Sequence, residues 1–451
     1  MTIANDRQAH ANAEVWNIGY PPGVDFAEKH MLTAEQTRIP TSRYTSEEFL
    51  AQELECLWKR TWQMVCRAEE IPEVGDYVDY AIADQEWLVV RQEDGGVKAF
   101  ANACRHRGNK IRSGSGGSTE LRCQYHHWCW NLDGSLREVP DRHLFIAIDD
   151  DAYALAEAAC STWAGFVFIN PDLHGAPSLE EWLGEVATQL APFHLDRMRA
   201  TTNMSTTVSC NWKVAVEAFL EVYHVQGIHP QLMPMIDDVN TAFELLGPHS
   251  RMITPFGVPS MRLEDVPDAM VYQAFMRQSG STVVNQDYRG EKGGSEVPEV
   301  SFEDQNVREY LIQHTREKGV TMGHDYSGLD DDQMIDDWHY LIFPGLVFNT
   351  HAGAFLLFRV RPHPDDPNRC LFDLWRYTWP DENQPTPEPA PNVHLDEGEG
   401  SYGLVLDQDF ANLPRVQKGL HSDHLDAITI SAQEVRVAHV HTVVDQFLAD
   451  G

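Results

Sequence analysis

Two pairs of Cys and His lie close together in this chain and constrain its fold more than any other feature. Cys104-x-His106 is followed, after sixteen intervening residues, by Cys123-x-x-His126. Two thiolates and two imidazoles suit a zinc ion, or an iron–sulfur cluster in which two His replace two Cys on one iron. The spacing does not choose between these metals, but both require the two pairs to meet on neighbouring loops.

Small residues in the segment between the pairs favour the cluster. They are Gly108, Ser113, Gly114, Ser115, Gly116 and Gly117. Such residues let backbone N–H groups approach bridging sulfurs, and hydrogen bonds to sulfur tune the reduction potential of a cluster. A structural zinc site does not need these contacts.

The pattern around the pairs predicts a small β domain. Apolar and polar residues alternate over 75–104 and again over 121–139, with Gly-containing turns between the runs. The chain, at 451 residues, is long enough for two or three domains. We expect an N-terminal arm over 1–45, a helix and a metal-binding β domain over 46–170, and a larger domain over 171–451.

The charge of the chain argues against general binding to nucleic acid or to an anionic membrane. Lys and Arg number 34 against 69 Asp and Glu, and both kinds of partner require a positive field. The N-terminus lacks the basic start and apolar core of a signal peptide. The longest apolar run, over 340–348, is far shorter than the roughly 20 residues that cross a bilayer. We therefore expect a cytoplasmic protein.

A second group of candidate metal ligands lies in "NWKVAVEAFLEVYHVQGIHP" (211–230). We expect a helix over 215–230. His224 and His229 are five residues apart, about 140° on a regular helix, so a break at Gly227 would let both rings converge. Two His and one carboxylate form the facial triad of a non-haem Fe(II) site with open positions for O2. Alone, the pair is weak evidence, because two unrelated surface His can share this spacing.

Together, the two groups resemble the α subunits of ring-hydroxylating oxygenases. The first motif resembles the family's Rieske [2Fe–2S] domain, and "NWK…E-x-F-x-E-x-Y-H-x4-H" is similar to its mononuclear-iron segment. The resemblance covers about residues 45–448. It implies an α+β fold: a small all-β Rieske domain, and a larger catalytic domain whose antiparallel sheet is covered by helices (helix-grip, START-like). Cys104, His106, Cys123 and His126 are implied as the cluster ligands, with the two Cys on one iron.

The resemblance also implies the ligands of the mononuclear Fe(II). They are His224, His229 and a carboxylate in "VLDQDFANLPRVQKGLHS" (405–422). Asp409 is the candidate and Asp407 the alternative. A carboxylate near a helix start is also a common cap, so either Asp can have a purely structural role.

A further carboxylate is implied to carry electrons between subunits. Glu221 is implied to link His224 to the cluster ligand His126 of an adjacent subunit, although a solvated helix glutamate is the simpler interpretation. The chain departs from the family pattern at three positions: His127, where Gly is usual; Cys129, where Ser or Thr is frequent; and Ala218, where many relatives have Asn.

The run over 338–362 alternates apolar residues as strands do, and by resemblance its sheet lines the substrate cavity. The candidates for the cavity wall are Phe343, Phe348, His351 and Phe358. Such side chains are also common in a core, so the pattern alone does not separate wall from core.

The resemblance implies a terminal oxygenase that uses O2 to hydroxylate, in first place to dihydroxylate, a hydrophobic aromatic or polycyclic substrate. Monooxygenation and O- or N-demethylation are the alternatives within the family. Electrons come from a ferredoxin or a ferredoxin reductase. NAD(P)H acts only through that separate reductase, because "GEGSYG" (398–403) follows an acidic loop and not a strand, unlike a dinucleotide site. The family's electron route crosses a subunit boundary, which implies a homotrimer or an α3β3 assembly.

Basic residues surround the cluster motif of this acidic chain: Arg105, Arg107, Lys110, Arg112 and Arg122. We expect this basic rim to dock an acidic electron donor, with internal ion pairs as the alternative. Two other interpretations fit the cluster motif. One is a zinc-bearing ligand-binding protein without turnover, and the other is an electron carrier that uses the cluster alone.

Overall fold

The structure is a computed structural model that describes residues 32–33, 35–278, 297, 299–302 and 305–450. Residues 1–31 and 34, most of the expected N-terminal arm, lie outside the described residues. The chain divides into a large unit, residues 1–50 and 188–446, and a small unit, residues 51–187 and 447–451. The sequence predicts boundaries after residues 45 and 170, whereas the structure divides the chain after residues 50 and 187.

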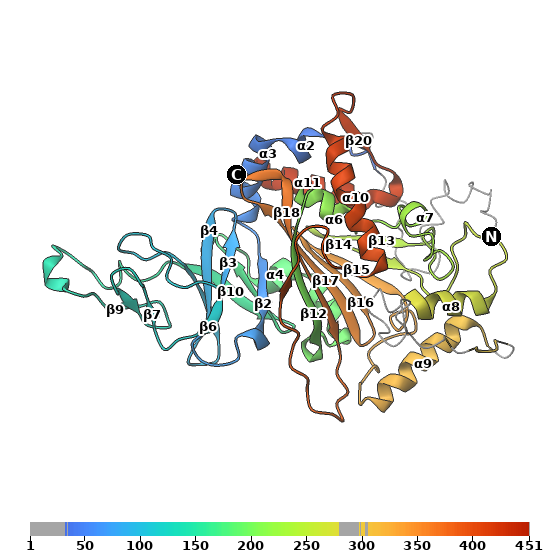
Figure 1. Ribbon diagram of the computed structural model, residues 1–451, viewed down its shortest axis with the longest axis horizontal. Helices are drawn as coiled ribbons and strands as arrows, with labels where there is room; N and C mark the ends of the chain where they lie inside the picture. The colour runs from blue at the N-terminus through green and yellow to red at the C-terminus, as the bar shows by residue number, and fades with distance from the viewer. Residues whose placement is uncertain (1–31, 34, 279–296, 298, 303–304, 451) are drawn as a thin grey trace. The chain divides into compact units, whose positions relative to one another are not determined.

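The small unit is a β domain built on a seven-stranded antiparallel sheet (Figure 1). In spatial order its strands are β2 (Gln63–Arg67), β11 (Phe166–Asn170), β10 (Glu157–Trp163), β5 (Val97–Ala101), β4 (Gln85–Arg91), β3 (Asp76–Ile82) and β6 (Ser115–Gly117). A three-stranded sheet contains β7 (Leu121–Arg122), β8 (Cys129–Trp130) and β9 (Leu136–Glu138). The β structure predicted over 75–104 and 121–139 is therefore confirmed.

Short helices flank these strands in the chain. The segment before β2 contains α3 (Glu47–Glu53) and a π-helical stretch, Leu54–Trp58. After β11 come α4 (Leu179–Leu183) and α5 (Glu185–Leu190). Ser178 and Glu181 form a capping box that fixes the start of α4.

The core of the small unit includes the two Cys of the metal motif. Cys104 and Cys123 are buried in one cluster with Phe100, Leu121 and Trp128. The apolar packing that stabilises the β domain therefore also fixes the positions of both thiols.

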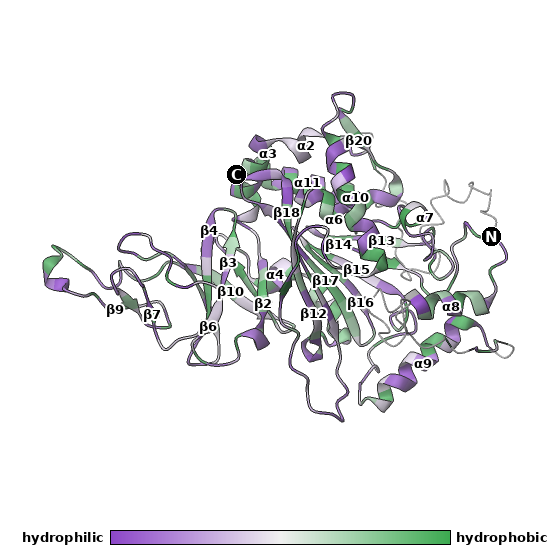
Figure 2. Cartoon of the chain, viewed as in Figure 1, coloured by the Kyte–Doolittle hydropathy of each residue, from purple (hydrophilic) through white to green (hydrophobic). Residues whose placement is uncertain are grey.

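The large unit is organised around an eight-stranded sheet (Figure 1). In spatial order its strands are β13 (Ala242–Leu246), β14 (His249–Thr254), β15 (Asp337–Ile342), β16 (Leu346–His351), β17 (Ala354–His363), β18 (Asp366–Thr378), β12 (Arg199–Val208) and β19 (Val393–His394). All neighbours are antiparallel except β12 and β19, which are parallel. Figure 2 shows hydrophobic and hydrophilic residues mixed along the strands of this sheet.

The large unit also contains helices. They are α2 (Ser42–Thr45), α6 (Trp212–Glu217), α7 (Val225–Ile228), α8 (Asp268–Gln278), α9 (Val307–Thr321), α10 (Leu404–Leu420) and α11 (Val435–Asp450). Helix α6 packs on β17 and β18, and α10 packs on α6 and β12. A two-stranded sheet pairs β1 (Arg38–Pro40) with β20 (Ala427–Thr429). The predicted α+β class, with a small β domain and a larger domain in which helices pack on an antiparallel sheet, is confirmed.

The helix predicted over 215–230 is wrong in its extent. Helix α6 ends at Glu217, and only the single turn of α7 follows. Between them the backbone N–H of His224 donates to Glu221 Oε2 at 2.9 Å, a local side-chain contact that competes with helical hydrogen bonding. Gly227 lies inside α7, so the interruption precedes His224 and does not occur at the glycine.

Among the described residues, no helix combines the length and the apolar character needed to cross a bilayer.

Candidate metal centres

Two loops of the same construction present the Cys and His pairs of the small unit. The amide of Cys104 donates to the carbonyl of Asn109 at 2.8 Å, and the amide of Gly108 donates back to the carbonyl of Cys104 at 2.9 Å. In the second loop, the amide of Cys123 donates to Trp128 at 2.9 Å and that of His127 donates to Cys123 at 3.0 Å. The pairs thus occupy equivalent positions in two matching turns.

This repeated turn explains why a His at position 127 is unusual. Gly108 has φ of +74° and His127, its counterpart in the second loop, has φ of +62°. Both lie in the left-handed region, where Gly is strain-free and other residues are uncommon. The His127 side chain is exposed.

The two imidazoles of the motif lie next to each other. The ring centroids of His106 and His126 are 4.6 Å apart, and His106 also stacks on Trp128 at 5.2 Å. Nδ1 of His106 is buried and has no hydrogen-bond partner among the described residues. Burial, His126 and Arg107 together lower the pKa of His106, which favours the neutral ring that binds metals.

The thiols are tuned by nearby N–H groups. Burial acts to raise the pKa of Cys123, but the backbone N–H groups of Tyr125 and His126 and the amide of Asn109 lower it below its ordinary value. The N–H of Tyr125 lies 3.4 Å from Cys123 Sγ, and Asn109 Nδ2 lies 3.6 Å from it. These donors stabilise a thiolate, the form that binds a metal.

The contacts of the small residues with bridging sulfurs stay a prediction, and the N–H donors to the Cys sulfurs are other residues. Gly116 and Gly117 belong to β6, where they pair with β3. The donors to sulfur come instead from the residues that follow each Cys, and from Asn109. Cys129 lies in β8, fully buried, and burial, with Glu120, raises its pKa to about 11.

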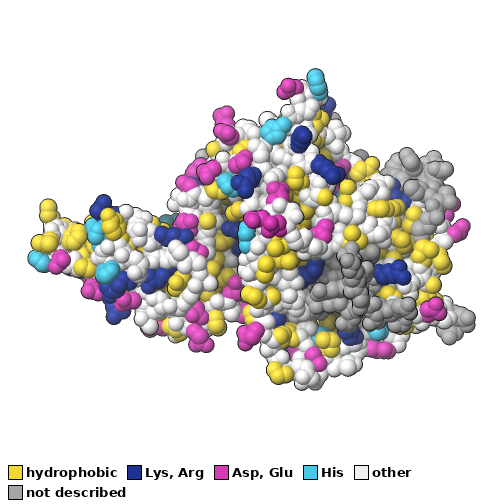
Figure 3. Space-filling model, in the orientation of Figure 1, with side chains coloured by type: hydrophobic (Ala, Val, Ile, Leu, Met, Phe, Trp, Pro, Cys, Tyr) yellow, Lys and Arg dark blue, Asp and Glu magenta, His cyan; other side chains and the backbone are white. Residues whose placement is uncertain are grey.

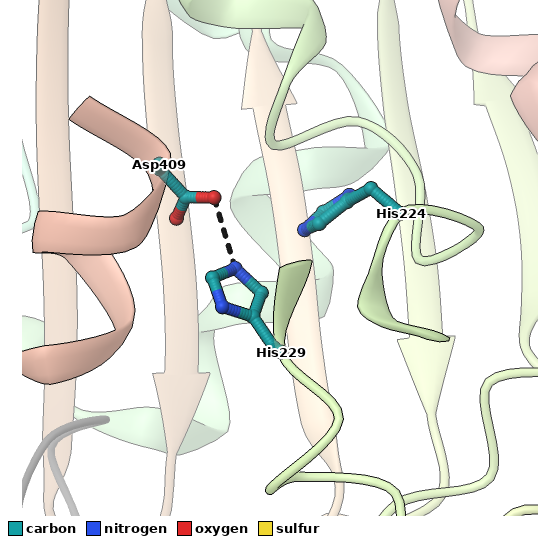
Figure 4. A group of neighbouring side chains, drawn as sticks. All are labelled: His224, His229 and Asp409. Atoms are coloured by element: carbon teal, nitrogen blue, oxygen red, sulfur yellow. Dashed lines mark hydrogen bonds and ion pairs between the residues drawn. The ribbon is translucent and has the colours of Figure 1, made fainter. Parts of the chain in front are cut away.

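A second group of three residues converges in the large unit. His224, His229 and Asp409 each offer one ligand atom, and these atoms lie within 4.8 Å of one another (Figure 4). Among the described residues this is the one group of three or more His, Cys, Asp or Glu that is so close. The two His stand at opposite ends of the one-turn helix α7, which brings their ring centroids to 5.1 Å.

Asp409 and Asp407 have different environments, although both lie near the start of α10. Asp409 is buried and its Oδ1 is 2.9 Å from His229 Nε2. Asp407 accepts hydrogen bonds from Ser401 Oγ and from the backbone N–H of Tyr402 at 2.7 Å. Asp407 therefore has the structural role of fixing the turn into the helix, and Asp409 joins the two His.

Two outer residues orient the imidazoles. Glu221 Oε1 lies 2.8 Å from His224 Nδ1, and Gln408 Oε1 lies 2.8 Å from His229 Nδ1. Such contacts fix the tautomer and leave Nε2 of each ring for the metal. Burial lowers the pKa of His224, but the carboxylates of Glu221, Asp409 and Asp238 outweigh burial and raise it. Sequence reasoning missed Gln408, for which the only signal was its position beside Asp409.

A cavity of about 110 Å³ adjoins His224, His229 and Asp409. Apolar side chains make up most of its lining, among them Phe219 and Phe256. The sheet strands β14 to β17 form one wall of the cavity.

The candidates for the cavity wall were only partly right. Phe358 lines the cavity, whereas Phe343, Phe348 and His351 do not. Phe348 faces the other side of the sheet from its neighbour Asn349, which lines the cavity, because successive strand residues alternate. Phe343 is buried beyond the end of β15. His351 lies on the same face of β16 as Asn349, with its ring centroid 5.7 Å from that of Phe256, but is not among the residues that line the cavity.

Comparison with known families identifies both units. The Rieske [2Fe-2S] domain matches residues 61–147, and the Ring hydroxylating alpha subunit (catalytic domain) matches residues 195–450, more than half of the chain. This chain belongs to the ring-hydroxylating α-subunit family. The family carries a Rieske [2Fe–2S] cluster and a mononuclear iron.

Relatives of this α subunit include both dioxygenases and monooxygenases. Chlorobenzene dioxygenase subunit alpha of Cupriavidus sp. (strain PS12) is 35% identical over 193 residues, which cover 40% of this chain and 42% of that protein. Carnitine monooxygenase oxygenase subunit of Acinetobacter pittii (strain PHEA-2) is 31% identical over 195 residues, 43% of this chain and 52% of that protein. The matched regions therefore span about half or less of these relatives.

The fold of this α subunit is similar to that of a solved quaternary ammonium Rieske monooxygenase. The TM-score is 0.66 at 19% identity, over 92% of this chain and 97% of the other. At that identity the likeness concerns the fold.

The Cys and His pairs fit the family's two-iron cluster better than a single zinc ion. Four ligands of one zinc ion lie roughly 3.3–3.8 Å apart. Among the described residues, no three ligand atoms of the Cys and His pairs lie within 4.8 Å of one another. The two thiols interact with each other and the two rings adjoin each other. A two-plus-two arrangement matches one iron held by Cys104 and Cys123 and another held by His106 and His126.

The basic rim of this α subunit is smaller than the sequence predicts. Lys110 pairs with Asp79 at 2.7 Å and with Glu86 at 2.9 Å. The other two internally engaged residues are Arg112, which donates to Arg122 O, Glu120 O and Ser118 Oγ, and Arg122, which pairs with Glu120 and Glu138. Figure 3 shows acidic side chains among the Lys and Arg of the small unit.

Only part of the basic rim keeps an uncompensated charge. Arg105 and Arg107 are exposed and have no ion pair with a carboxylate among the described residues. Arg105 donates to the carbonyl of Ala152, and Arg107 lies over the ring of Tyr125 at 5.3 Å. The alternative of internal pairing thus holds for Lys110 and Arg122.

Proposed function

We propose that this chain is the terminal oxygenase component of a multicomponent system that hydroxylates a small, mainly hydrophobic organic substrate with O2. The observation that carries the proposal is the convergence of His224, His229 and Asp409 on the wall of a largely apolar cavity. Two His and one carboxylate leave coordination positions open, as O2-activating Fe(II) sites require. An apolar cavity beside them places an organic substrate next to those positions.

We assign the ligands as follows. Cys104, Cys123, His106 and His126 hold the [2Fe–2S] cluster. The mononuclear Fe(II) is held by His224, His229 and Asp409. When bound, these groups supply one-electron transfer and a site at which O2 reacts.

The surrounding residues position the iron ligands and exclude water. Glu221 and Gln408 hold the Nδ1 atoms of His224 and His229, so that both rings present Nε2. Val222, Val225 and Leu406 line the cavity near these ligands and keep it apolar. Exclusion of water limits side reactions at the site.

The cavity volume limits the size of the substrate. A cavity of about 150 Å³ accommodates benzene in another protein, and this cavity has about 110 Å³. A single ring or a short chain fits with small side-chain movements, whereas a polycyclic substrate requires the wall to rearrange. We therefore favour a substrate of about one ring.

The reaction consumes two electrons from outside the chain. Dihydroxylation of an arene takes up O2, two electrons and two protons, and both oxygen atoms enter the product. Monohydroxylation takes up the same reagents, but one oxygen atom leaves as water. A ferredoxin or a ferredoxin reductase is the proposed donor, with Arg105 and Arg107 in the docking surface. NAD(P)H acts through that reductase.

Glu221 is the proposed electron bridge between copies of the chain. It contacts His224 through both its carboxylate oxygens, which bond the ring and the backbone N–H. In the proposed assembly, a homotrimer or α3β3, the same carboxylate meets His126 of an adjacent copy. A hydrogen-bonded carboxylate between two metal ligands gives a short electron path.

Labelled oxygen tests the proposal. The reduced protein is supplied with a ferredoxin, a reductase and 18O2, and the products from single-ring aromatic, methoxylated and methylammonium compounds are analysed by mass spectrometry. Two labelled atoms in one product indicate dioxygenation, and one labelled atom or release of formaldehyde indicates monooxygenation or demethylation. No labelled product from a protein whose cluster is reduced and reoxidised would favour an electron carrier. A colourless protein with zinc would favour a ligand-binding protein.

A further inference from the structure

Polar side chains interrupt the sheet wall of the cavity at one place. Across the sheet, Met252 of β14 pairs with His339 of β15, His339 pairs with Asn349 of β16, and Asn349 pairs with Leu356 of β17. All four side chains line the cavity. His339 and Asn349 form what we call the polar row. Directly opposed residues have Cβ atoms about 4.5–5.5 Å apart, so the side chains of His339 and Asn349 can both contact the same polar group of a ligand.

The environment of His339 fixes which of its ring nitrogens carries the proton. Arg436 Nη1 lies 3.0 Å from His339 Nδ1, and a guanidinium can only donate. Nδ1 is therefore the acceptor, and Nε2 carries the hydrogen. Burial and the charge of Arg436 lower the pKa of His339 well below its ordinary value, so the ring is neutral. His339 thus presents a single N–H donor at Nε2.

The part of the chain that the structure describes offers no partner to that donor. His339 Nε2 and Asn349 Nδ2 are both buried, and neither makes a hydrogen bond to any of the described residues. His339 is only 2% exposed. Buried donors without a partner destabilise a fold by about 1–3 kcal/mol each, so a pair of them on a cavity wall is expected to serve a ligand.

The charges behind the polar row favour an acceptor. Arg436 is fully buried and also donates to Ser250 Oγ at 2.9 Å, which holds the guanidinium in place. Asp337, two residues before His339 on the same strand face, also lines the cavity. Burial raises the pKa of Asp337 to about 8, with a contribution from Asp336 and against the attraction of Arg436. Because its pKa is raised, the carboxyl of Asp337 offsets the charge of Arg436 less than an exposed aspartate would.

We propose that the polar row binds an oxygen acceptor of the substrate, a carboxylate or a carbonyl, through His339 Nε2–H and Asn349 Nδ2–H. The substrate therefore has an apolar body of about one ring and one polar oxygen group, and is not a plain hydrocarbon. The inference rests on the proposed function in taking the cavity as the substrate site. The polar row anchors one end of the substrate, and the apolar lining holds the remainder beside His224, His229 and Asp409.

Four single-ring probes test the inference without turnover. The full chain, loaded with both metal groups, is titrated anaerobically with toluene, benzamide, benzoate and benzylamine, and binding is measured by calorimetry. We expect benzoate or benzamide to bind about tenfold or more tightly than toluene, the effect of one or two hydrogen bonds to buried donors. The order of benzoate and benzamide distinguishes a carboxylate from a carbonyl.

A variant of the polar row identifies the source of the preference. Asn349→Leu removes one donor and keeps a similar side-chain size, and we expect it to abolish most of the preference while the toluene affinity changes by less than about threefold. Leu356→Met, the next residue along the same row, is the matched control and is expected to keep the preference. If Asn349→Leu does not fold, Asn349→Ala gives the same test.

Four results would overturn the inference. They are equal affinity for toluene and the oxygenated probes, tightest binding by benzylamine, no binding of any probe at about 10 mM, and an unchanged preference in both Asn349 variants. Because calorimetry needs no product, these results are independent of the labelled-oxygen experiment. Absence of labelled product together with a clear preference for benzoate would remove the proposed function and keep the polar row as a site for an oxygen acceptor.

Discussion

The two metal-binding regions of this chain hold their side chains in different ways. In the large unit, the ring nitrogens of His229 have partners in Gln408 and Asp409, and His224 has a partner in Glu221. In the small unit, Nδ1 of His106 is buried without a partner among the described residues, and two thiols are buried in the apolar core. Each His of the iron triad has a hydrogen-bond partner in the protein, whereas His106 Nδ1 in the small unit has none among the described residues.

This difference has a physical consequence for folding. Buried polar groups without partners destabilise a fold, and a bound metal supplies the missing interactions. Loss of the cluster should therefore weaken the small unit, while loss of the mononuclear iron should stop chemistry and leave the large unit folded. The predictions below test the two halves of this comparison.

The largest expected effect follows removal of the buried carboxylate of the triad. Asp409→Ala should lower iron from about three to about two per chain and reduce product formation at least about 100-fold, because loss of even an outer partner of a ligand has effects of about 10–100-fold. The cluster absorption should not change. Asp407→Ala is the matched control: it should keep all the iron and lower stability by about 0.5–2 kcal/mol through loss of the contacts that fix the start of α10.

Removal of a cluster thiolate should affect the fold of the small unit. Cys123→Ala should lose the visible absorption, leave about one iron per chain, and lower the free energy of unfolding of this unit by at least about 2 kcal/mol. Limited proteolysis and iron analysis check this. Cys129→Ala, a buried thiol of the same unit that lies outside the proposed ligand set, should keep the cluster. Equal free energies of unfolding of Cys123→Ala and Cys129→Ala would contradict the claim that the small unit depends on its bound cluster for stability.

The charge of Glu221 should matter for electron transfer and not for iron binding. Glu221→Gln keeps an oxygen acceptor near His224, so iron should remain, but turnover should fall by about 10–100-fold. Stopped-flow spectroscopy should show normal cluster reduction and slow reoxidation in the presence of substrate and O2. Glu217→Gln is the matched control, because Glu217 pairs with His441 at 2.8 Å and lies in the same segment. A similar slowing in both variants would contradict the proposed bridge.

The smallest effect concerns docking of the electron donor. Arg107→Glu should slow reduction by an acidic ferredoxin by about 3–10-fold at low salt and flatten its salt dependence. Lys110→Glu should slow reduction less than Arg107→Glu, because Lys110 is held by Asp79 and Glu86 and is not free to contact the donor, and should lower stability by about 1 kcal/mol or less. Identical reduction rates in the unchanged protein, Arg107→Glu and Lys110→Glu would contradict the docking proposal.

The sequence offers candidates for the metal-binding side chains because the chemistry of such ligands is carried by short motifs. The Cys and His pairs of the small unit span residues 104–126, and in the large unit His224 and His229 are separated by one short helix. The third carboxylate could not be chosen from sequence. Asp407 and Asp409 both lie near the start of α10, and only the three-dimensional position of His229 separates the capping residue from its partner.

The features that sequence reasoning missed depend on long-range packing. Phe348 was predicted to face the cavity because an alternating pattern does not show which alternate set faces inward, and a shift of one residue reverses the faces. Lys110 was predicted to be free because Asp79 and Glu86, its partners, come from earlier strands. The polar row also could not be predicted, since His339 and Asn349 are neighbours only through the register of β15 and β16.

Mössbauer spectroscopy of the 57Fe-enriched, anaerobically reduced chain tests the central claim most directly. We predict about two irons in a [2Fe–2S] spectrum, with one sulfur-ligated and one nitrogen-ligated iron, and about one iron in a separate high-spin ferrous spectrum. The ferrous spectrum should disappear in Asp409→Ala, and the cluster spectrum should remain. Iron in a single environment, or a ferrous spectrum that persists without Asp409, would contradict the account of two distinct metal centres.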